Sequence, residues 1–505
     1  MFDHRRALIP DFEAFLDAVH SEPDLFLRAN ALRMPGPQLA EGLRRAGLEV
    51  EPLPFSPHAL RVRGLASPGA TLEHMLGLYH VQGATSMLAP LALDVRPGHR
   101  VLDLCAAPGS KTTQIAELLA GRGWVLANDP YLDRLAVLKH HVERLGHTSV
   151  AIAHNNGAAF ANGLRFDRVL VDAPCSGEGR WRLGAAGAAH RPARAYTESE
   201  VARLHALQRT LLRRAANLVE PGGRIVYSTC TYAPEENEAV VADVLRERPD
   251  LQLEPLPPEL GGEPGLTVWG GRRFGETLAL TRRHYPHRSW NASGFFIARL
   301  RRDPDAAVRD RHRHRPLGGG EHEREAALRE SALAYLHERF GLERAALAPA
   351  RPLASGRTVW LCSPEMPHPR GLERWRVQNP GLRLVRDRSS RLKPTSTGLV
   401  ATGSALRRAV LPLTPHEFAT LLAGQRVARA ADAPEIVALQ GGYAAAQLGE
   451  RVVGCVFVRR DGIASQIPRD TARRVREALF VLGPRLRWAE GEDGAWRAEA
   501  VAARR

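Results

Sequence analysis

Short apolar runs alternate with longer amphipathic stretches between about residues 69 and 302. Runs rich in Val, Leu and Ile predict buried strands, and apolar residues spaced three or four positions apart predict helices. The predicted strands are Arg100 to Leu104, Trp124 to Asn128, Val150 to Ala153, Arg168 to Val171 and Arg224 to Ser228. The predicted helices are Thr112 to Ala120, Leu132 to Leu145, Glu198 to Leu218 and Glu235 to Arg246. This alternation predicts an α/β fold with a doubly wound parallel sheet and ligand sites at the carboxyl ends of its strands.

The segments on either side of this core follow other patterns. Residues 1–68 combine an amphipathic stretch, Phe12 to Val19, with short apolar alternation, and they predict a small α/β module. After the core, a helix from Glu321 to Phe340 begins a region of mixed short strands. Its last part contains a predicted helix, Pro415 to Leu422, and an alternating strand, Arg451 to Val458. We therefore expect an additional α+β region after the core.

Charge indicates a polyanionic partner. The chain of 505 residues holds 70 basic and 55 acidic side chains, which gives a formal net charge of +15. Arg and Lys side chains that neutralise phosphates supply affinity that falls with salt. A basic stretch within residues 303–330 contains Arg311 to Arg315 and is followed by Gly318 to Gly320. We expect a solvated linker there, with a dedicated RNA contact as the alternative.

Other composition features limit the class of protein. No uninterrupted apolar run reaches 18 residues, and acidic residues interrupt the N-terminal segment, so we expect a cytoplasmic protein with no membrane association. The 5 cysteines include no CxxC pair, so we expect neither a disulfide framework nor a metal site. The lysines are only Lys111, Lys139 and Lys393, and Lys111 lies within a candidate ligand turn. A lysine there favours a site that a broad guanidinium would not fit.

The sequence contains a candidate ligand-binding turn and two cysteines at predicted strand ends. Residues Val101 to Thr113 predict a strand, a turn of small residues and a helix start, where a ligand can approach the backbone. The turn has neither the P-loop nor the GxGxxG spacing. Asp129 ends the next predicted strand and is a candidate ribose ligand or helix N-cap. Cys175 and Cys230 each follow a predicted strand, so they could converge with Asp172 on one cleft.

These blocks together resemble the Nop/Sun family of RNA cytosine-5 methyltransferases, from about Gly77 to Leu300. The motifs that carry the resemblance are CAAPGSKT from Cys105, DAPCSGEG from Asp172, and STCT from Ser228, followed by Pro234 to Glu238. The resemblance implies a Rossmann-like class I methyltransferase core in residues 69–302 and S-adenosylmethionine as cofactor. The implied cofactor contacts are Cys105, Ala106, Ala107, Pro108, Gly109, Ser110, Lys111, Asp129, Arg134, Asn156 and Asp172.

The resemblance also implies the catalytic residues. It makes Cys230 the nucleophile and Cys175 a helper in product release. Carbon 5 of cytosine is a poor nucleophile, so a thiolate must first add to carbon 6. Lys111 is the candidate cation that lowers the thiol pKa, and Asp172 could contact ring nitrogen 3 of the base. Two positions depart from the family pattern, because Asn156 and Gly83 stand where acidic residues are common.

The tail resembles that of the bacterial F-type 16S ribosomal RNA methyltransferases. This implies a ferredoxin-like domain in residues 331–414 and a PUA-like RNA-binding domain in residues 415–505, with residues 1–68 as a further RNA-binding module. The implied partner is 16S ribosomal RNA or the small ribosomal subunit, and we expect a monomer.

Three alternative functions remain open at this point. One is a tRNA cytosine-5 methyltransferase, and another is a catalytically silent RNA-binding assembly factor. The third is a DNA cytosine methyltransferase, which attacks from a Pro-Cys loop such as Pro174-Cys175. Intact Cys175, Cys230, Asp172 and Lys111 argue against a silent factor, and the loop around Cys230 argues against the DNA enzyme.

Overall fold

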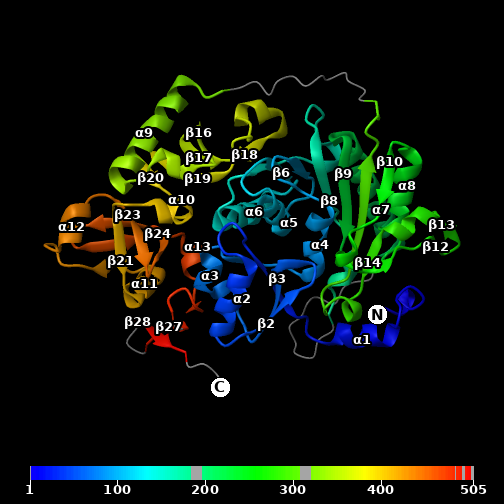
Figure 1. Ribbon diagram of the computed structural model, residues 1–505, viewed down its shortest axis with the longest axis horizontal. Coiled ribbons are helices and arrows are strands. Elements are labelled where there is room, and N and C mark those ends of the chain that lie inside the picture. The colour runs from blue at the N-terminus through cyan, green and yellow to red at the C-terminus, as the bar shows by residue number, and fades with distance from the viewer. Residues whose placement is uncertain are drawn as a thin grey trace.

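The computed structural model describes residues 2–182, 196–307, 320–389, 391–483, 485–491 and 495–501. The basic run Arg311 to Arg315 lies outside these described residues. In Figure 1 the N-terminal unit (blue) lies below α5 (Ser110–Leu118) and α6 (Leu132–Leu145), with the last strands of the chain, β27 (Leu486–Glu490) and β28 (Trp496–Ala500), on its left. None of the helices in the described ranges is long and apolar enough to cross a membrane.

The N-terminal unit is a four-stranded sheet with the order β2-β3-β1-β4. Its elements are α1 (Phe12–His20), β1 (Leu25–Ala29), α2 (Gly36–Arg45), β2 (Glu49–Leu53), β3 (Ser56–Arg63), α3 (Leu72–Met75) and β4 (Tyr79–Val81). Helix α1 forms where the amphipathic pattern predicts it and buries Phe12, Phe15 and Val19. Strand β4 pairs with β1, so the unit continues to Val81. The sheet therefore extends past the expected boundary at residue 68, which stays a prediction.

The central unit contains a ten-stranded sheet. Its first elements are α4 (Ala84–Ala92), β5 (Arg100–Asp103), α5 (Ser110–Leu118), β6 (Trp124–Asn128), α6 (Leu132–Leu145), β7 (Val150–Ala153) and β8 (Phe166–Asp172). They continue with α7 (Glu198–Leu218), β9 (Val219–Thr229), α8 (Glu238–Glu247), β10 (Leu251–Glu254), β11 (Glu263–Pro264), β12 (Val268–Trp269), β13 (Arg272–Arg273), β14 (Arg282–His284) and β15 (Phe295–Arg302). Strands β12 and β13 form a separate two-stranded sheet.

Helices cover both faces of the central sheet, as the doubly wound prediction requires. Strands β9, β8, β5, β6 and β7 are parallel neighbours in that order, and β15 runs antiparallel beside β9. Leu102 and Val169 lie in the apolar cluster that includes side chains of α7 and α8. Val101 and Leu170 lie in the cluster that includes α4, α5 and α6. Successive residues of one strand thus pack against helices on opposite faces.

The C-terminal region forms three smaller sheets, one of four, one of five and one of three strands. The first part contains α9 (Glu323–Phe340), β16 (Arg351–Ser355), β17 (Thr358–Cys362), β18 (Val377–Asn379), β19 (Leu382–Arg388), β20 (Arg391–Pro394) and α10 (Ser396–Thr402). The second part contains β21 (Val410–Leu413), α11 (Pro415–Leu422), β22 (Val427–Ala428), α12 (Pro434–Leu439), β23 (Tyr443–Leu448), β24 (Arg451–Arg459) and β25 (Gly462–Ser465). The last elements are α13 (Arg469–Ala472), β26 (Glu477–Ala478), β27 (Leu486–Glu490) and β28 (Trp496–Ala500).

Three observed features differ from the expectations for this region, whose domain boundaries stay predictions. Strands β16, β17, β19 and β20 are antiparallel neighbours in sequence order, with the helices before and after them. The split βαβ order expected of a ferredoxin-like domain is therefore not found among these described strands. Strand β21 pairs with β23, so the expected boundary at residue 414 divides one sheet. Helix α9 begins at Glu323, inside the expected linker. The PUA-like assignment of the last region stays a prediction.

One strand from the C-terminal region completes the central sheet. Strand β18 pairs antiparallel with β7, the last parallel strand. The Trp375 side chain beside it is buried in the core cluster under α7 and donates a hydrogen bond from Nε1 to the Ala161 carbonyl at 3.1 Å. The central and C-terminal units therefore share a sheet and a core.

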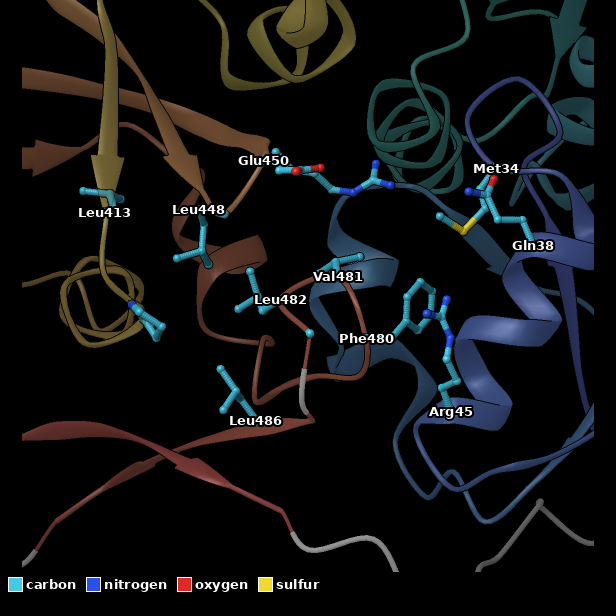
Figure 2. Close-up of a pocket in the computed structure, with 14 residues that line it drawn as sticks. Met34, Gln38, Arg45, Leu413, Leu448, Glu450, Phe480, Val481, Leu482 and Leu486 are labelled. Carbon is cyan, nitrogen blue, oxygen red and sulfur yellow. The ribbon is translucent and has the colours of Figure 1, made fainter.

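A buried carboxylate joins the N-terminal unit to the last part of the chain. Glu73 of α3 is fully buried, and its Oε1 accepts hydrogen bonds from the backbone N–H groups of Leu479, Phe480 and Val481 at 2.9, 2.9 and 3.1 Å. Burial raises the pKa of Glu73, and these N–H groups act in the opposite direction. The same loop lines a cavity of about 560 Å³ opposite Met34 and Gln38 of the N-terminal unit (Figure 2).

We predict that Glu73→Ala loosens this contact locally. The N–H groups of Leu479, Phe480 and Val481 would lose their acceptor, and a buried group left unsatisfied costs about 1 to 3 kcal/mol. Amide hydrogen exchange at residues 479–481 should become faster, while exchange in β5 and β6 stays slow. Glu41→Ala, which removes an exposed carboxylate on α2, is the matched control and should leave exchange unchanged. Unchanged exchange at residues 479–481 in Glu73→Ala would contradict this role.

Candidate active site

The turn between β5 and α5 packs closely against helix α6. Gly109 has a φ of 109°, in the left-handed region, and a Cβ atom there would lie 2.5 Å from the Leu138 side chain. Only glycine fits both conditions. Arg28 of β1 supports the turn, because it donates hydrogen bonds to the Ser110 carbonyl at 2.8 Å and to Glu117 Oε2 at 2.9 Å. Sequence reasoning missed Arg28, because no local pattern links β1 to α5.

At the start of this turn, only one carboxyl oxygen of buried Asp103 has a hydrogen-bond partner among the described residues. Asp103 is fully buried, and its Oδ2 accepts a hydrogen bond from Thr112 Oγ1 at 2.7 Å. Its Oδ1 has no hydrogen-bond partner among the described residues. Burial raises the pKa of Asp103 to about 7. Sequence reasoning did not single out Asp103, although an acidic residue at the end of an apolar strand was the available signal.

Asp129, which directly follows β6, links the turn to α6 through hydrogen bonds and an ion pair. Its Oδ2 accepts a hydrogen bond from the Ala107 N–H at 3.3 Å and lies 3.1 Å from Arg134 Nη1. Its Oδ1 accepts from the Tyr131 N–H at 3.1 Å. Burial raises the pKa of Asp129, and Arg134 opposes that change. Arg134 also donates to the Ala107 carbonyl, so both predicted residues contact the predicted cofactor turn.

The remaining predicted cofactor residues differ in placement. Asn156 is exposed and uses its side chain to accept a hydrogen bond from the Ala158 N–H at 3.0 Å. Its neighbour Asn155 donates to the Trp375 carbonyl at 2.6 Å, which ties this loop to the C-terminal region. Cys105 is half-buried in the turn, and burial raises the pKa of its thiol. Asn156 therefore lies on a different loop from the turn that begins at Cys105.

Lys111, Asp172 and Ser228 form a connected polar group. Lys111 Nζ lies 2.7 Å from Asp172 Oδ2, and the Ser228 hydroxyl donates to Asp172 Oδ1 at 2.8 Å. The parallel register of β8 and β9 places Asp172 directly beside Ser228. Lys111 also lies over the Phe295 ring at 5.1 Å. The structure thus brings Lys111 from the first motif to Asp172 from the second.

The two predicted thiols lie in contact just beyond these strand ends. Cys175 Sγ is 3.4 Å from Cys230 Sγ, and the Cys230 N–H donates to Cys175 Sγ at 3.4 Å. Both side chains are half-buried. The structure describes no group of three or more His, Cys, Asp or Glu side chains able to hold a metal within its ranges.

The surroundings of the pair favour a thiolate on Cys230. A hydrogen bond from the Cys175 thiol lowers the pKa of Cys230, and the positive charges of Arg180 and Lys111 act in the same direction. Burial and the charge of Asp172 oppose this change. The same hydrogen bond and burial raise the pKa of Cys175. Arg180 was missed by sequence reasoning, which named only Lys111 as the activating cation.

A third contact set fixes the two cysteine loops against each other. Glu236 Oε2 accepts hydrogen bonds from the Ser176 N–H at 2.9 Å and from Gln208 Nε2 at 2.8 Å. The hydroxyls of Ser176 and Thr231 are 2.7 Å apart. Gly179 donates its N–H to the Cys230 carbonyl at 2.9 Å. The loops are therefore coupled by several hydrogen bonds close to both sulfur atoms.

Most of the central unit matches a known family of enzymes. A sequence profile described as 16S rRNA methyltransferase RsmB/F matches residues 90–301. A 28S rRNA (cytosine-C(5))-methyltransferase of Mus musculus is 40% identical over 295 residues, which cover 57% of this chain and 36% of that protein. The ribosomal RNA small subunit methyltransferase F of Erwinia tasmaniensis is 39% identical over 242 residues, covering 46% of this chain and 47% of that protein.

A solved structure agrees with the fold. The methyltransferase homolog protein from Pyrococcus horikoshii has a TM-score of 0.50 and 32% identity, and the match covers 57% of this chain and 90% of that chain. The central sheet is therefore the class I methyltransferase core that the sequence predicts.

An archaeal relative is matched over nearly its whole length. The tRNA (cytosine(49)-C(5))-methyltransferase of Pyrococcus abyssi is 33% identical over 301 residues, covering 59% of this chain and 94% of that protein. Together with the RsmB/F profile and the shared core, this match confirms the resemblance that the three motifs carry, and the chain belongs to the family of RNA (cytosine-C5) methyltransferases.

Proposed function

We propose that this protein methylates carbon 5 of cytosine in RNA by covalent cysteine catalysis. The observation that carries the proposal is the contact between the Cys175 and Cys230 sulfur atoms, 3.4 Å apart at the end of the sheet that also presents Asp172. The chain spans about a third to a half of the length of the eukaryotic relatives it matches. The activity is therefore argued from the site itself.

The turn between β5 and α5 fits S-adenosylmethionine, the cofactor of this family. Its small residues put little side-chain bulk on the turn, and Asp103 Oδ1 has no partner among the described residues. Residues 105–111 would hold the methionine part, and Asp129 with Arg134 would face the ribose. Asn156 would lie near the adenine, where an amide can both donate and accept hydrogen bonds. When bound, the cofactor supplies a methyl group on a positively charged sulfur.

Cys230 supplies the nucleophile. Its thiolate adds to carbon 6 of the cytosine, which forms a carbon–sulfur bond and pushes the electron pair of the ring double bond toward carbon 5. The lowered pKa of Cys230 increases the thiolate fraction at neutral pH. Asp172, held by Lys111 and Ser228, faces ring nitrogen 3 and supports the proton that this nitrogen gains during attack.

Cys175 assists the release of the product. After methyl transfer, the proton on carbon 5 must leave before the bond between carbon 6 and Cys230 can break. Once Cys230 is bonded to the base, it no longer carries the negative charge that the Cys175 proton stabilises. The pKa of Cys175 then falls, because the two thiols titrate as a coupled pair. Cys175 can therefore act as the base for carbon 5 at this stage.

We infer that the substrate is 16S ribosomal RNA and that the chain acts as a monomer. The match to the ribosomal RNA small subunit methyltransferase F supports this substrate. All the site residues come from one chain. Bisulfite mapping of small-subunit, large-subunit and transfer RNA from a strain that lacks the protein tests the choice. Loss of 5-methylcytosine only from transfer RNA would reject 16S ribosomal RNA and favour the archaeal type of substrate.

The hairpin formed by β19 and β20 offers a surface for the RNA backbone. Its register places Arg386 opposite Lys393 and Arg388 opposite Arg391. Lys393 also donates a hydrogen bond to Gln466 Oε1 and lies over the Tyr443 ring. Like charges directly opposite each other nevertheless destabilise a sheet. A polyanion would remove the repulsion. We propose that these residues bind RNA phosphates and thereby add affinity to the core.

The roles of the two thiols can be separated by mutation. Cys230→Ala should abolish methyl transfer and give no covalent RNA adduct, because no nucleophile can add to carbon 6. Cys175→Ala should still form the adduct and release it slowly, so a protein–RNA band that survives denaturation should accumulate. Labelled RNA on a denaturing gel measures both results. Cys362→Ala, which changes a buried thiol of β17, is the control. The reverse pattern would assign the nucleophile to Cys175.

A salt titration tests the β19–β20 hairpin. Arg388→Ala combined with Arg391→Ala should weaken RNA binding and make its salt dependence shallower, by about 0.7 in the logarithmic slope for each lost phosphate contact with single-stranded RNA. The affinity for S-adenosylmethionine should stay unchanged. Arg344→Ala, an exposed arginine outside the hairpin, is the control. An unchanged salt slope in the double variant would rule out this surface.

A further inference from the structure

The first residues of the chain pack against the two cysteine loops. Phe2 is buried and contacts Trp181, which follows the Cys175 loop, and Tyr232, which follows Cys230, with ring centroids 5.7 and 6.1 Å away. Phe15 of α1 contacts Tyr232 at 5.5 Å. The N-terminal segment therefore covers both loops from one side.

His4 and Arg5 are the basic residues of this contact, and His4 Nε2 lies 3.7 Å from Glu178 Oε1. Arg5 makes the closer contacts. Its Nη2 lies 3.0 Å from Glu178 Oε1 and its Nε lies 3.3 Å from Glu178 Oε2, so the guanidinium binds this carboxylate with two nitrogens. Its Nη1 lies 3.5 Å from Glu235 Oε2. Arg5 and Glu178 are both buried, while 45% of the Glu235 side chain is exposed. Such a two-point contact fixes geometry as well as charge.

The two carboxylates belong to different cysteine loops. Glu178 lies in the DAPCSGEG segment with Cys175, and Glu235 lies in the segment that follows Cys230. Between them, the loops make direct contacts near the sulfur atoms, such as the hydroxyl pair of Ser176 and Thr231. Arg5 thus bridges the outer ends of two loops whose inner ends carry the thiols.

We propose that Arg5 is a positioning residue of the active site, because it joins Glu178 of one cysteine loop to Glu235 of the other and so holds Cys175 against Cys230. The proposal rests on the function proposed above and adds the N-terminal segment to its machinery. Without the guanidinium, two carboxylates would face each other, and buried Glu178 would keep only the half-exposed His4 imidazole, 3.7 Å away, as a basic neighbour. Their repulsion and hydration would separate the loops and lengthen the contact between the two sulfur atoms.

The test is the pH dependence of Cys230 alkylation in the full chain. Iodoacetamide reacts with the thiolate, and peptide mass spectrometry reports Cys230 separately from the other thiols. In Arg5→Ala the alkylation midpoint should move about one pH unit upward, which makes the reaction about tenfold slower near neutral pH. Methyl transfer should lose kcat with little change in the KM for S-adenosylmethionine.

A neighbouring arginine is the matched control. Arg6 pairs with Glu13 on the surface, and 56% of its side chain is exposed. Arg6→Ala should leave the alkylation profile and kcat unchanged. Arg5→Lys keeps the charge but cannot hold two carboxylates in the same geometry, so it should recover only part of the wild-type profile. Full recovery by lysine, or an unchanged profile in Arg5→Ala, would overturn the positioning role.

If Arg5→Ala does not fold, a less disruptive substitution, Glu235→Gln, can still test the proposal. Glu235→Gln changes a half-exposed carboxylate and weakens one end of the bridge, so it should shift the profile upward by a smaller amount. An unchanged profile in this folded variant would also overturn the proposal. The alkylation assay needs neither RNA nor methyl transfer. If wild-type protein fails to methylate RNA while Arg5→Ala still shifts the profile, the proposed function fails and the positioning role stands.

Discussion

The parallel register of β8 and β9 is the constraint on which the site depends. It places Asp172 beside Ser228 at the end of the sheet, and each chain segment then leaves its strand toward the same edge. Cys175 and Cys230 follow at once, so their sulfur atoms meet. A shift of one residue in this register would turn side chains to the opposite face and separate the groups. The loop contacts and the N-terminal segment stabilise a juxtaposition that the sheet has already determined.

Charge balance at the strand ends explains how the half-buried Cys230 thiol can ionise. Asp172 alone would disfavour a thiolate, but it is paired with Lys111, and the two charges largely offset each other. Arg180 then supplies a further positive charge, and the Cys175 thiol donates a hydrogen bond. Negative charge is therefore stabilised at one sulfur by a donor whose own pKa is raised. The asymmetry between two chemically identical side chains comes from their surroundings.

Local patterns predicted the local structure well. Helix α6 and strands β6 and β7 have the predicted bounds, because each is a continuous run of one periodicity with clear ends. The meeting of Cys175, Cys230, Asp172 and Lys111 was also predictable, since parallel strands end at the same edge. The contacts of Arg28 with Glu117 and of β18 with β7 join segments far apart in the sequence. Such contacts produce no periodic pattern of hydrophobic residues, so the sequence could not predict them. The ferredoxin-like expectation came from resemblance alone, and the observed strand order differs from it.

The pairing of β18 with β7 has a consequence for folding during synthesis on the ribosome. The whole methyltransferase core leaves the ribosome before β18 is made, so β7 then presents an unpaired edge of backbone N–H and C=O groups. Such edges are templates for pairing with other chains. Until residue 377 emerges, the nascent core is open to aggregation or needs a chaperone to cover that edge. By covering the edge of β7, strand β18 protects the newly made core from aggregation. This role is separate from any contact with RNA.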